Sequence, residues 1–595
     1  MSSHGSHDAA SSGAEKTAAS HDIEPVGVRQ RIPIVKAGHG EAAKVEGAQE
    51  KTVHNVSLDN SPSPSPSPSP SPPPPAKAEF FAAVQESEIR AWSKQSLLLY
   101  YCIFVAFCCA CANGYDGSLM TSIIAMDHFQ NVFQTGKTGT QVSVIFSLYT
   151  VLVSPSPRAP SGSMVGAPFA AVLSDRFGRR KGMFCGAIVI ILGSIIIASS
   201  GTLPQFVVGR FILGFGISIM TVAAPAYAIE IAPPHWRGRC TGFYNCGWFG
   251  GSIPAAIVTF GTNYIDNDYS WRIPLILQAF TCLIVLGSVF FLPESPRFLM
   301  ANGREEEAIA FLTKFHGNGN REAKLVVLQV EEMREGIALD GIDKVWWDYR
   351  PLFLTHSGRW RMAQVLMISI FGQFSGNGLG YFNTVIFENL GVKSVPTQLG
   401  YNILNQVLSA VGALTAVAFT DRMPRRKVLI IGTLLCSATL ATNSGLSAAL
   451  ANQGANIDIS YGQGALASYF LFNVIFSFTY TPLQGAIPTE ALETTTRAKG
   501  LALSGFLVNA VGFINQFAGP IALGNIGYQY IYVFVGWDVV EALLWYLFGV
   551  ESQGRTIEQL EWVYQQPNPV KASLQVDKVI VADGKVLEKV VDVTA

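Results

Sequence analysis

Charged residues are scarce in this sequence, and their scarcity narrows the class of protein. Asp, Glu, Lys and Arg together make up 14% of the 595 residues, whereas hydrophobic residues make up 49%. Because soluble proteins carry roughly 25% charged residues, the composition excludes an ordinary soluble protein. The net charge of −1 gives no sign of attraction to nucleic acid, and we expect no nucleic-acid partner.

Catalytic and metal-binding patterns are also missing. None of the nine histidines falls inside a long apolar run, and there is no Gly-x-Ser-x-Gly elbow and no Walker loop. Cys108 and Cys111 have the spacing of a metal or redox pair, but they lack a second pair and lie in an apolar run. We interpret them as packing residues. We therefore expect no enzyme, no cofactor and no metal site.

The first 90 residues contain no apolar run. Residues 61–75 are a Ser-Pro repeat that ends in four prolines, and the rest of the segment is polar. Such a composition cannot bury a core, so we expect a disordered cytoplasmic tail over residues 1–90. We also expect no signal peptide, so that the first membrane helix serves as its own insertion signal.

Twelve apolar runs follow, and each has about the 20 residues that a membrane-spanning helix needs. They cover approximately residues 97–125, 141–173, 182–202, 206–229, 240–262, 271–292, 362–386, 400–420, 427–450, 464–488, 499–523 and 528–549. The long gap in the middle contains two amphipathic segments, 304–316 and 321–337, which predict short helices on the cytoplasmic face. The sequence thus predicts an all-α membrane protein with, after the tail, a six-helix half (91–292), a cytoplasmic linker (293–361), a second six-helix half (362–550) and a cytoplasmic tail (551–595).

The second run is interrupted. Gln141–Val151 and Ser163–Leu173 are apolar pieces of 11 residues each, and residues 152–162 between them contain three prolines and an arginine. Joined directly, the two pieces would form about 33 Å of helix, which matches one bilayer crossing. Prolines and a charge at membrane depth are costly. Our hypothesis is that residues 152–162 come from a mistranslated or unspliced segment; if they are genuine, the helix must be broken there.

A basic loop occurs twice. Ser174–Lys181 reads Ser-Asp-Arg-Phe-Gly-Arg-Arg-Lys, and Thr420–Lys427, 246 residues later, reads Thr-Asp-Arg-Met-Pro-Arg-Arg-Lys. Basic residues in the short loops number twelve on the side of these two loops against three on the other. The positive-inside rule therefore predicts that both termini are cytoplasmic. A feature that recurs at half-chain spacing in a hydrophobic protein suggests the two related halves of a secondary transporter.

Further motifs accompany the two loops in a fixed order. They are Gly114-Tyr115-Asp116, Gly209-Arg210, Glu230-Ile231-Ala232-Pro233 with Arg237-Gly238, Pro293-Glu294-Ser295-Pro296-Arg297, Glu490 with Arg497-Ala498-Lys499-Gly500, and Gly554-Arg555-Thr556. Together they resemble the sugar porter family of the major facilitator superfamily over residues 95–565, most closely its fungal branch of lactose-permease-like and other sugar–proton symporters. The departures are Ala171 and Val417 at the loop starts, and Pro424 in place of a glycine. The resemblance implies the major facilitator fold, with twelve spans in two halves.

Asp116 is the strongest candidate for proton coupling. It lies about twenty residues into the first apolar run, where a carboxylate costs roughly 2.5–3.5 kcal/mol unless it is partnered. Gly114 and Gly117 would let the helix unwind beside it. Arg210 is the expected cation, because the resemblance implies that proton symporters of the family oppose such an acid to this arginine. The alternative is a permanent ion pair that only locks the helices.

Charges at the cytoplasmic ends of the spans have a different expected role. The resemblance implies salt bridges between helices that hold the outward-facing state and break when the protein opens inward. For the arginines alone, a purely topological role is the alternative. The candidates for this conformational gating are Asp175, Arg176, Arg179, Arg180, Glu230, Arg237, Glu294, Arg297, Asp421, Arg422, Arg425, Glu490 and Arg497.

Sugar recognition requires amides, hydroxyls and aromatic faces near the middle of the membrane. The candidates for substrate binding are Asn245, Gln278, Gln373, Asn377, Asn383 and Asn509, with Gln406, Gln484, Asn515 and Gln516 in a wider set. For each of them, hydrogen bonding between helices is the rival interpretation. Gly485 stands where many hexose carriers have tryptophan, which would leave a wider pocket and favour a disaccharide without excluding a smaller sugar.

These observations predict a proton-coupled hexose or disaccharide transporter of the plasma membrane that works by alternating access. Its expected partners are the sugar, protons and the lipid bilayer, and we expect it to function as a monomer. The alternatives are a passive sugar facilitator, a carrier of another polyol such as quinate or inositol, and a sugar sensor that does not transport.

Overall fold

The computed structural model describes residues 92–150, 173, 176–234, 237–342, 349–419, 423–452, 459–493, 496–553, 557–582 and 585–592. The chain divides into two compact units. The larger one, Asn55–Leu574, contains the described helices, and the smaller one, Met1–His54 with Gln575–Ala595, contains the described strands.

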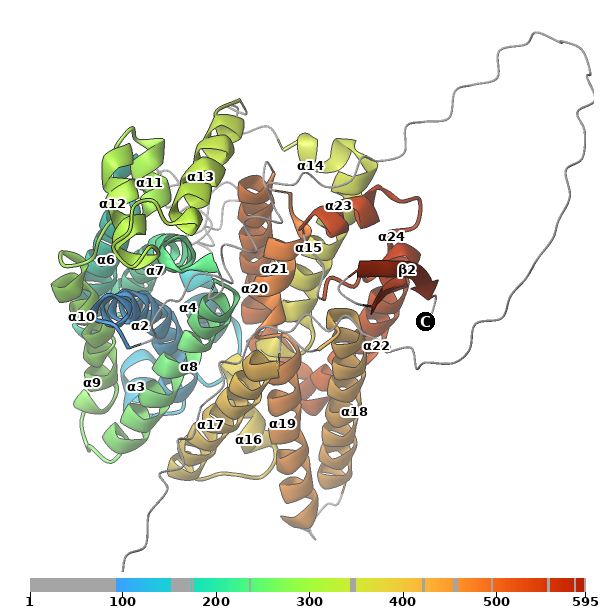
Figure 1. The fold of residues 1–595 in the computed structure, drawn as a ribbon. Coiled ribbons are helices and arrows are strands. Elements are labelled where there is room, and N and C mark those ends of the chain that lie inside the picture. The colour runs from blue at the N-terminus through green and yellow to red at the C-terminus, as the bar shows by residue number, and fades with distance from the viewer. Residues whose placement is uncertain are drawn as a thin grey trace, which may run out of the picture. The chain divides into compact units, whose positions relative to one another are not determined.

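Helices occupy all six apolar runs of the first half (Figure 1). They are α2 (Lys94–Ile123), α3 (Asp127–Phe133), α4 (Thr140–Thr150), α6 (Arg179–Ala198), α7 (Leu203–Ile231), α8 (Arg237–Thr262), α9 (Tyr269–Leu277) and α10 (Ala279–Val289). The second run is represented by α4, because the segment proposed as an insert, residues 152–162, lies outside the described residues. The sixth run is divided at Gln278, which separates α9 from α10.

Four helices lie in the described part of the linker. They are α11 (Pro296–Ala301), α12 (Glu305–Phe315), α13 (Lys324–Ile342) and α14 (Pro351–Leu354). Two of them, α12 and α13, coincide with the amphipathic segments that the sequence predicts. Three glutamates in the first turn of α12 and Lys314 in its last turn complement the helix dipole. Its apolar face, with Phe311 and Leu312, is buried.

The second half repeats the helical pattern with more interruptions. It contains α15 (His356–Phe374), η2 (Asn377–Phe382), α16 (Asn383–Asn389), α17 (Val395–Phe419), α18 (Arg425–Ala451), α19 (Ile459–Thr479), α20 (Leu483–Ala491), α21 (Arg497–Ile526), η4 (Gly527–Gln529) and α22 (Tyr530–Phe548). The seventh run breaks at Ser375-Gly376, where Gly376 has a left-handed φ of +83°, a conformation that glycine adopts without strain. The tenth run breaks before Pro482.

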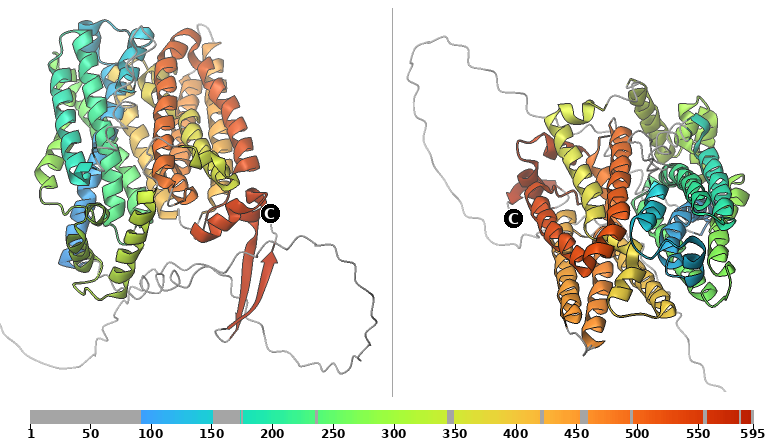
Figure 2. Two further views of the ribbon diagram at one scale, coloured as in Figure 1. Left: turned by 90° about the horizontal axis from the view of Figure 1, so that it is seen from above. Right: turned by 180° about the vertical axis from the view of Figure 1, so that it is seen from behind.

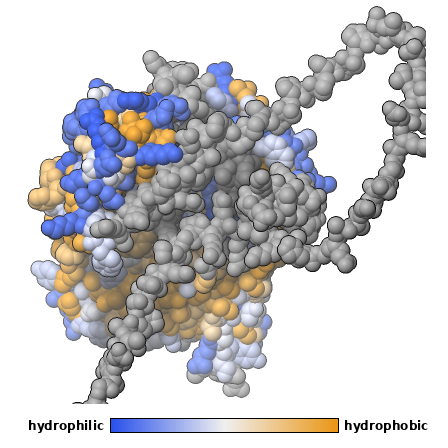
Figure 3. All heavy atoms as spheres, in the orientation of Figure 1, coloured by the Kyte–Doolittle hydropathy of each residue, from blue (hydrophilic) through white to orange (hydrophobic). Residues whose placement is uncertain are grey.

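The helices of the two halves form neighbouring bundles, coloured blue to green and yellow to red in Figure 2. Eight helical stretches within the described residues are long and apolar enough to cross a membrane. Hydrophobic side chains cover much of the bundle surface, whereas the linker helices present mostly hydrophilic residues (Figure 3). Ile195 and Phe280 are two hydrophobic residues on the bundle surface, at 58% and 60% exposed. Such a surface suits contact with lipid rather than water.

Close packing of α2 against α8 depends on glycines. A Cβ at Gly114 would collide with the Trp248 carbonyl, and one at Gly251 would collide with the Cys111 carbonyl. Helix α2 runs without interruption from Lys94 to Ile123. The expected unwinding beside Asp116 is therefore wrong, and Gly114 instead allows two backbones to approach closely.

The chain after the last span is more structured than the predicted tail. In the larger unit, α23 (Ile557–Gln565) and α24 (Pro569–Leu574) follow α22, and the Arg361 guanidinium lies 4.7 Å from the ring centre of Tyr564 on α23. In the smaller unit, β1 (Val576–Ala582) and β2 (Lys585–Asp592) pair antiparallel, from Val576 opposite Asp592 to Ala582 opposite Lys585. The sequence signal for this hairpin is an Asp-Gly dipeptide between two runs rich in valine.

Candidate functional site

Asp116 and Arg210 form a buried ion pair between two long helices. Asp116 on α2 is 1% exposed, and Arg210 on α7 is 2% exposed. The Arg210 guanidinium donates from Nη1 to Asp116 Oδ1. The sequence predicts this pairing, and the structure brings the two side chains together. Because isolated charges are very costly in a protein interior, each charge depends on the other.

Gln278 is a third member of this group. Its Nε2 donates to Asp116 Oδ1 at 2.8 Å, and its side chain is fully buried. The sequence analysis places Gln278 in the sugar site, whereas the structure directs its amide to the carboxylate. The neighbouring Tyr115 hydroxyl donates to the Pro274 carbonyl at 3.1 Å. Helix α2 is thus fastened to α9, just before the point where the sixth run is interrupted at Gln278.

One carboxylate oxygen of this group remains free. Asp116 Oδ2 is buried and has no hydrogen-bond partner among the described residues. An oxygen of a buried carboxylate without a donor is a suitable position for a proton or for a ligand hydroxyl. The group therefore combines a fixed cation, a fixed amide donor and one open acceptor.

Amides of the second half gather at the break in the seventh run. Asn377 Nδ2 donates to Gln373 Oε1 at 3.1 Å, and Asn515 Nδ2 on α21 donates to the Gln373 carbonyl at 2.7 Å. Gln516 is the next residue of α21, and its side chain is also buried. Two members of the predicted set, Gln373 and Asn377, are therefore brought together with Asn515 of the wider set.

The remaining candidates for sugar binding lie elsewhere. Asn383 is fully buried; it accepts from the Tyr469 hydroxyl at 2.6 Å and donates to Asn402 Oδ1 at 3.0 Å. These bonds favour the rival interpretation, a link between helices. Asn509 donates to the Gly505 carbonyl of its own helix at 2.9 Å.

Asn245 has a different environment, beside Gly485. A Cβ at Gly485 would collide with the Asn245 amide nitrogen. The space that the missing tryptophan would leave is therefore filled by Asn245 in this structure. The expectation of a wider pocket at Gly485 is not met, because a residue of the other half occupies the space.

The two halves are joined at the far end of α2, near Ile123. Several side-chain contacts between described residues connect them there. They are Thr121 Oγ1 to the Tyr381 carbonyl (3.0 Å), Thr384 Oγ1 to the Thr121 carbonyl (3.0 Å), Asn402 Nδ2 to Ser122 Oγ (3.2 Å) and Lys137 to Glu388 (2.9 Å). The rings of Phe146 and Phe382 pack edge to face beside them, 5.0 Å apart. These contacts hold the two halves together at this end.

At the opposite end, the first half holds a charge cluster around the start of α6. Arg179 pairs with Glu230 at 3.1 Å, and Ser295 Oγ donates to the other oxygen of Glu230. Glu294 Oε1 accepts from the backbone N–H groups of Arg179 and Arg180 at 3.2 and 3.4 Å. A carboxylate at this position satisfies free N–H groups and complements the helix dipole. Burial nevertheless raises the pKa of Glu294.

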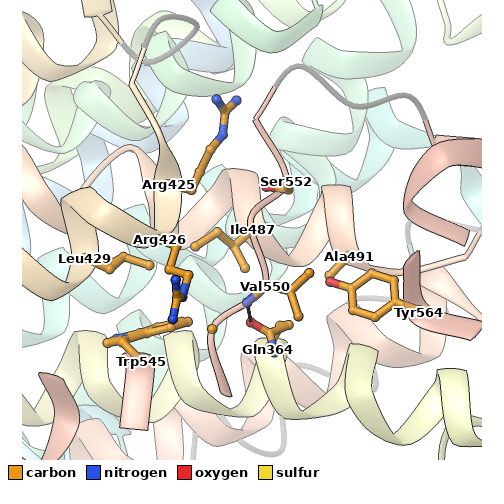
Figure 4. Close-up of a pocket in the computed structure, with 11 residues that line it drawn as sticks. Gln364, Arg425, Arg426, Leu429, Ile487, Ala491, Trp545, Val550, Ser552 and Tyr564 are labelled. Atoms are coloured by element: carbon orange, nitrogen blue, oxygen red, sulfur yellow. Dashed lines mark hydrogen bonds between the residues drawn. The ribbon is translucent and has the colours of Figure 1, made fainter. Parts of the chain in front are cut away.

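The second half repeats this cluster around the start of α18. Arg425 pairs with Glu490 at 3.1 Å, and Ser552 Oγ donates to Glu490 Oε2 at 2.6 Å. The Glu551 carboxylate accepts from the backbone N–H groups of Arg425 and Arg426 at 2.9 and 3.1 Å. Figure 4 shows the Arg425 and Arg426 side chains pointing in opposite directions from the start of α18, and Arg426 Nη2 reaches the Tyr546 carbonyl at 2.6 Å.

Glu551 and Ser552 are functional candidates that the sequence analysis missed. Glu551 accepts from the first backbone N–H groups of α18, as Glu294 does from those of α6. Ser552 donates to Glu490, as Ser295 donates to Glu230. The signal was present, because a Glu-Ser dipeptide follows the last apolar run of each half.

The other predicted gating residues are placed as follows. Asp175, Asp421 and Arg422, and the side chain of Arg237, lie outside the described residues. Arg176 is exposed, and Arg297 is half-buried on α11. Arg497 donates to the Leu492 carbonyl at 3.2 Å. Both observed carboxylate–arginine bridges of the predicted set join helices of one half and do not connect the halves.

Comparison with known proteins agrees with this geometry. Residues 101–564 match the family described as Sugar (and other) transporter. The chain is 26% identical over 466 residues to the MFS-type transporter criB of Aspergillus cristatus, covering 77% of this chain and 92% of that protein. It is 27% identical over 485 residues to the high-affinity glucose transporter of Kluyveromyces lactis, covering 79% and 86%.

A solved structure shares the fold. The proton:xylose symporter XylE of E. coli, bound to 6-bromo-6-deoxy-D-glucose, superposes with a TM-score of 0.64 at 22% sequence identity, covering 79% of this chain and 100% of that one. The predicted fold is thus confirmed. This multi-pass membrane protein belongs to the sugar transporter family of the major facilitator superfamily.

Proposed function

We propose that this protein is a proton-coupled transporter of a hexose, or of a disaccharide, that works by alternating access in the plasma membrane with both termini cytoplasmic. The observation that carries the proposal is the buried group of Asp116, Arg210 and Gln278, in which one carboxylate oxygen lies open. The names of the relatives support a monosaccharide first, since they specify glucose and xylose.

Protonation of Asp116 would change the forces between three helices. The charged carboxylate holds Arg210 of α7 and Gln278 of the sixth run at one oxygen. A neutral carboxyl attracts the guanidinium far less, so a buried arginine would then lack its counter-charge. Proton uptake therefore favours a different arrangement of α2, α7 and α9, which is the coupling that a symporter requires.

The driving force is sufficient for useful accumulation. Moving one charge across the membrane is worth about 2.3 kcal/mol per 100 mV. Because about 1.4 kcal/mol corresponds to a tenfold ratio, one proton at that voltage sustains roughly fifty-fold accumulation.

The sugar site in this proposal lies at the break of the seventh run. Gln373, Asn377 and Asn515 supply donors and acceptors there, and the Gly376 turn interrupts the helical span between Gln373 and Asn377. Tyr381, on the same broken segment, bonds through its carbonyl to Thr121 of the first half. A sugar bound to the amides would thereby act on the contacts that hold the two halves together at this end, which the predicted topology places outside.

In this proposal the charge clusters at the starts of α6 and α18 do not hold the two halves together. Arg179–Glu230 and Arg425–Glu490 each join helices of one half, so separation of the halves does not by itself break them. We propose that they hold the helix ends rigid while each half moves as a body.

A passive facilitator is the second candidate, and the same ion pair favours it. If Asp116 and Arg210 stay paired throughout the cycle, they lock α2 to α7 and no proton moves. Uptake by cells that lack their own sugar carriers distinguishes the two. A symporter accumulates D-glucose above the outside concentration and loses this on addition of a protonophore.

Asp116→Asn tests the same point within the protein. We expect it to abolish accumulation and to leave exchange of D-glucose across the membrane. Asp127→Asn makes the same chemical change at an exposed position of α3 and serves as the matched control. Accumulation by Asp116→Asn at the rate of the control would overturn the coupling proposal.

A further inference from the structure

Two acidic residues are buried in the last span, and the mechanism above uses neither. Asp538 and Glu541 on α22 are both 0% exposed. Their spacing of three residues places them on the same face of the helix. Acids within a membrane span are rare and are functional candidates by default.

Among the described residues, the groups that bond to the Glu541 carboxylate are neutral. Glu541 Oε2 accepts from Ser375 Oγ and from the Tyr480 hydroxyl, the latter at 3.2 Å. The Tyr480 hydroxyl is also bonded to Thr433 Oγ1 at 2.8 Å. The other Glu541 oxygen and both Asp538 oxygens are buried without a hydrogen-bond partner in the part of the chain that the structure describes.

No basic side chain serves as counter-charge in the described surroundings. Helix α22 packs mainly against α18 and also contacts α15. The titratable groups that face the acids are Cys436 of α18 and Tyr480, which follows α19, and both are neutral at physiological pH. Arg426 of α18 reaches α22 only at the Tyr546 carbonyl, five residues beyond Glu541.

This setting contrasts with that of Asp116. Asp116 has Arg210 as its counter-charge, whereas Glu541 has only hydroxyl donors and a second acid, Asp538, on the same helix face. Two carboxylate charges so close together and without a cation cannot both persist in a buried site, because each desolvated charge is costly and like charges repel. At least one of the pair must carry a proton.

The position of the pair links it to the candidate sugar site. Ser375, which donates to Glu541, is the residue that ends α15. The next residue is Gly376, whose left-handed backbone makes the break, and Gln373 and Asn377 lie on either side. The carboxyl pair is therefore bonded to the turn that presents the amides.

We propose that Asp538 and Glu541 form a proton-binding site in the second half, distinct from Asp116, and that the proton stabilises the break of the seventh span at Ser375. Loss of the proton leaves a second buried charge beside Ser375 and Tyr480. A second buried carboxylate is stable only if more hydrogen-bond donors reach it. The turn at Ser375-Gly376, which already bonds to Glu541, can supply them by changing its backbone conformation. This proton site does not depend on the coupling role proposed for Asp116.

Infrared difference spectroscopy of the purified full-length protein in lipid nanodiscs tests the proposal. The wild type is expected to show the C=O stretch of a protonated, buried carboxyl group at neutral pH, and Glu541→Gln or Asp538→Asn should remove or shift it. Glutamine and asparagine have the shapes of the neutral acids, so both variants should fold. The band should persist in Asp116→Asn, which separates this site from the coupling site. A band unchanged in both α22 variants would overturn the proposal.

Thermal stability gives a second readout. The melting temperature of the wild type should fall as the pH is raised from neutral to alkaline, because deprotonation creates the second buried charge. The double variant Asp538→Asn/Glu541→Gln should show a flatter profile. An equal slope in both proteins, or a band that disappears on adding sodium at constant pH, would contradict a proton site; the second result would indicate a metal-cation site.

Discussion

Gln278 donates to the Asp116 oxygen that also accepts from Arg210, at a distance of 2.8 Å. Gln278, at the interruption of the sixth apolar run, is therefore bonded directly to the charged side chain of Asp116 in the first apolar run. Because a hydrogen bond to a charged group contributes about 1.5–3 kcal/mol, this amide helps to hold the sixth run against α2.

Replacing Gln278 by Leu should therefore alter proton coupling more than it alters folding. Without the amide donor the carboxylate loses one of its two described hydrogen bonds, so we expect sugar uptake to fall roughly 10-fold or more and its pH profile to change. Uptake measured over a pH series checks this. Gln205→Leu, at an exposed position of α7, should keep the wild-type profile; the same profile in Gln278→Leu would contradict the assignment.

Asn383 and Asn377 should separate stability from sugar binding. Asn383→Ala removes the acceptor of the buried Tyr469 hydroxyl and the donor to Asn402 Oδ1, at a cost of about 1–3 kcal/mol for each unsatisfied group. We expect a clearly lower melting temperature for this variant. Asn377→Ala removes a half-buried amide and should raise KM for the sugar with little change in melting temperature. The reverse pattern would place the sugar at Asn383.

Glu294 should make stability depend on pH in the acid range. Its pKa is raised from the ordinary value of 4.5, chiefly by burial. A carboxyl with a raised pKa in the folded protein stabilises it below about pH 4.5, and this contribution is lost as the pH rises through the folded-state pKa. Glu294→Gln, which can still accept from the α6 backbone, should flatten this part of the melting-temperature profile. An unchanged slope would indicate that other acids set the dependence.

Removal of residues 152–162 should improve transport. The deletion joins the two 11-residue apolar pieces of the second run into one uninterrupted span. We expect several-fold higher uptake by the deletion variant, measured per molecule at the membrane. Deletion of eleven residues from the N-terminal tail, 20–30, is the control of equal length. Full activity of the intact chain and none after deletion of 152–162 would show that the segment belongs to the working protein.

The periodic and compositional features of the chain could be predicted from the sequence. Long apolar runs predicted the helices, because backbone N–H and C=O groups inside a membrane must be hydrogen-bonded within the protein, and a helix does this. The basic repeat indicated two halves, and a charged residue in each of two apolar runs indicated the Asp116–Arg210 pair.

Features that depend on neighbouring helices could not be predicted. Gly114 resembles a flexible point in the sequence, but the Trp248 backbone of α8 explains its presence. Gln278 resembles a sugar ligand until its distance to Asp116 is known. The breaks at Ser375 and Gln278 lie inside continuous apolar runs, so composition alone does not mark them.

The proposed coupling of sugar to proton movement is tested most directly by the internal pH of sealed vesicles. Purified full-length protein is reconstituted with a pH-sensitive dye inside, and D-glucose, D-xylose and lactose are added outside in turn. The account predicts that entry of the transported sugar acidifies the interior, and that Asp116→Asn removes the acidification. Entry of labelled sugar with no change in internal pH would contradict it.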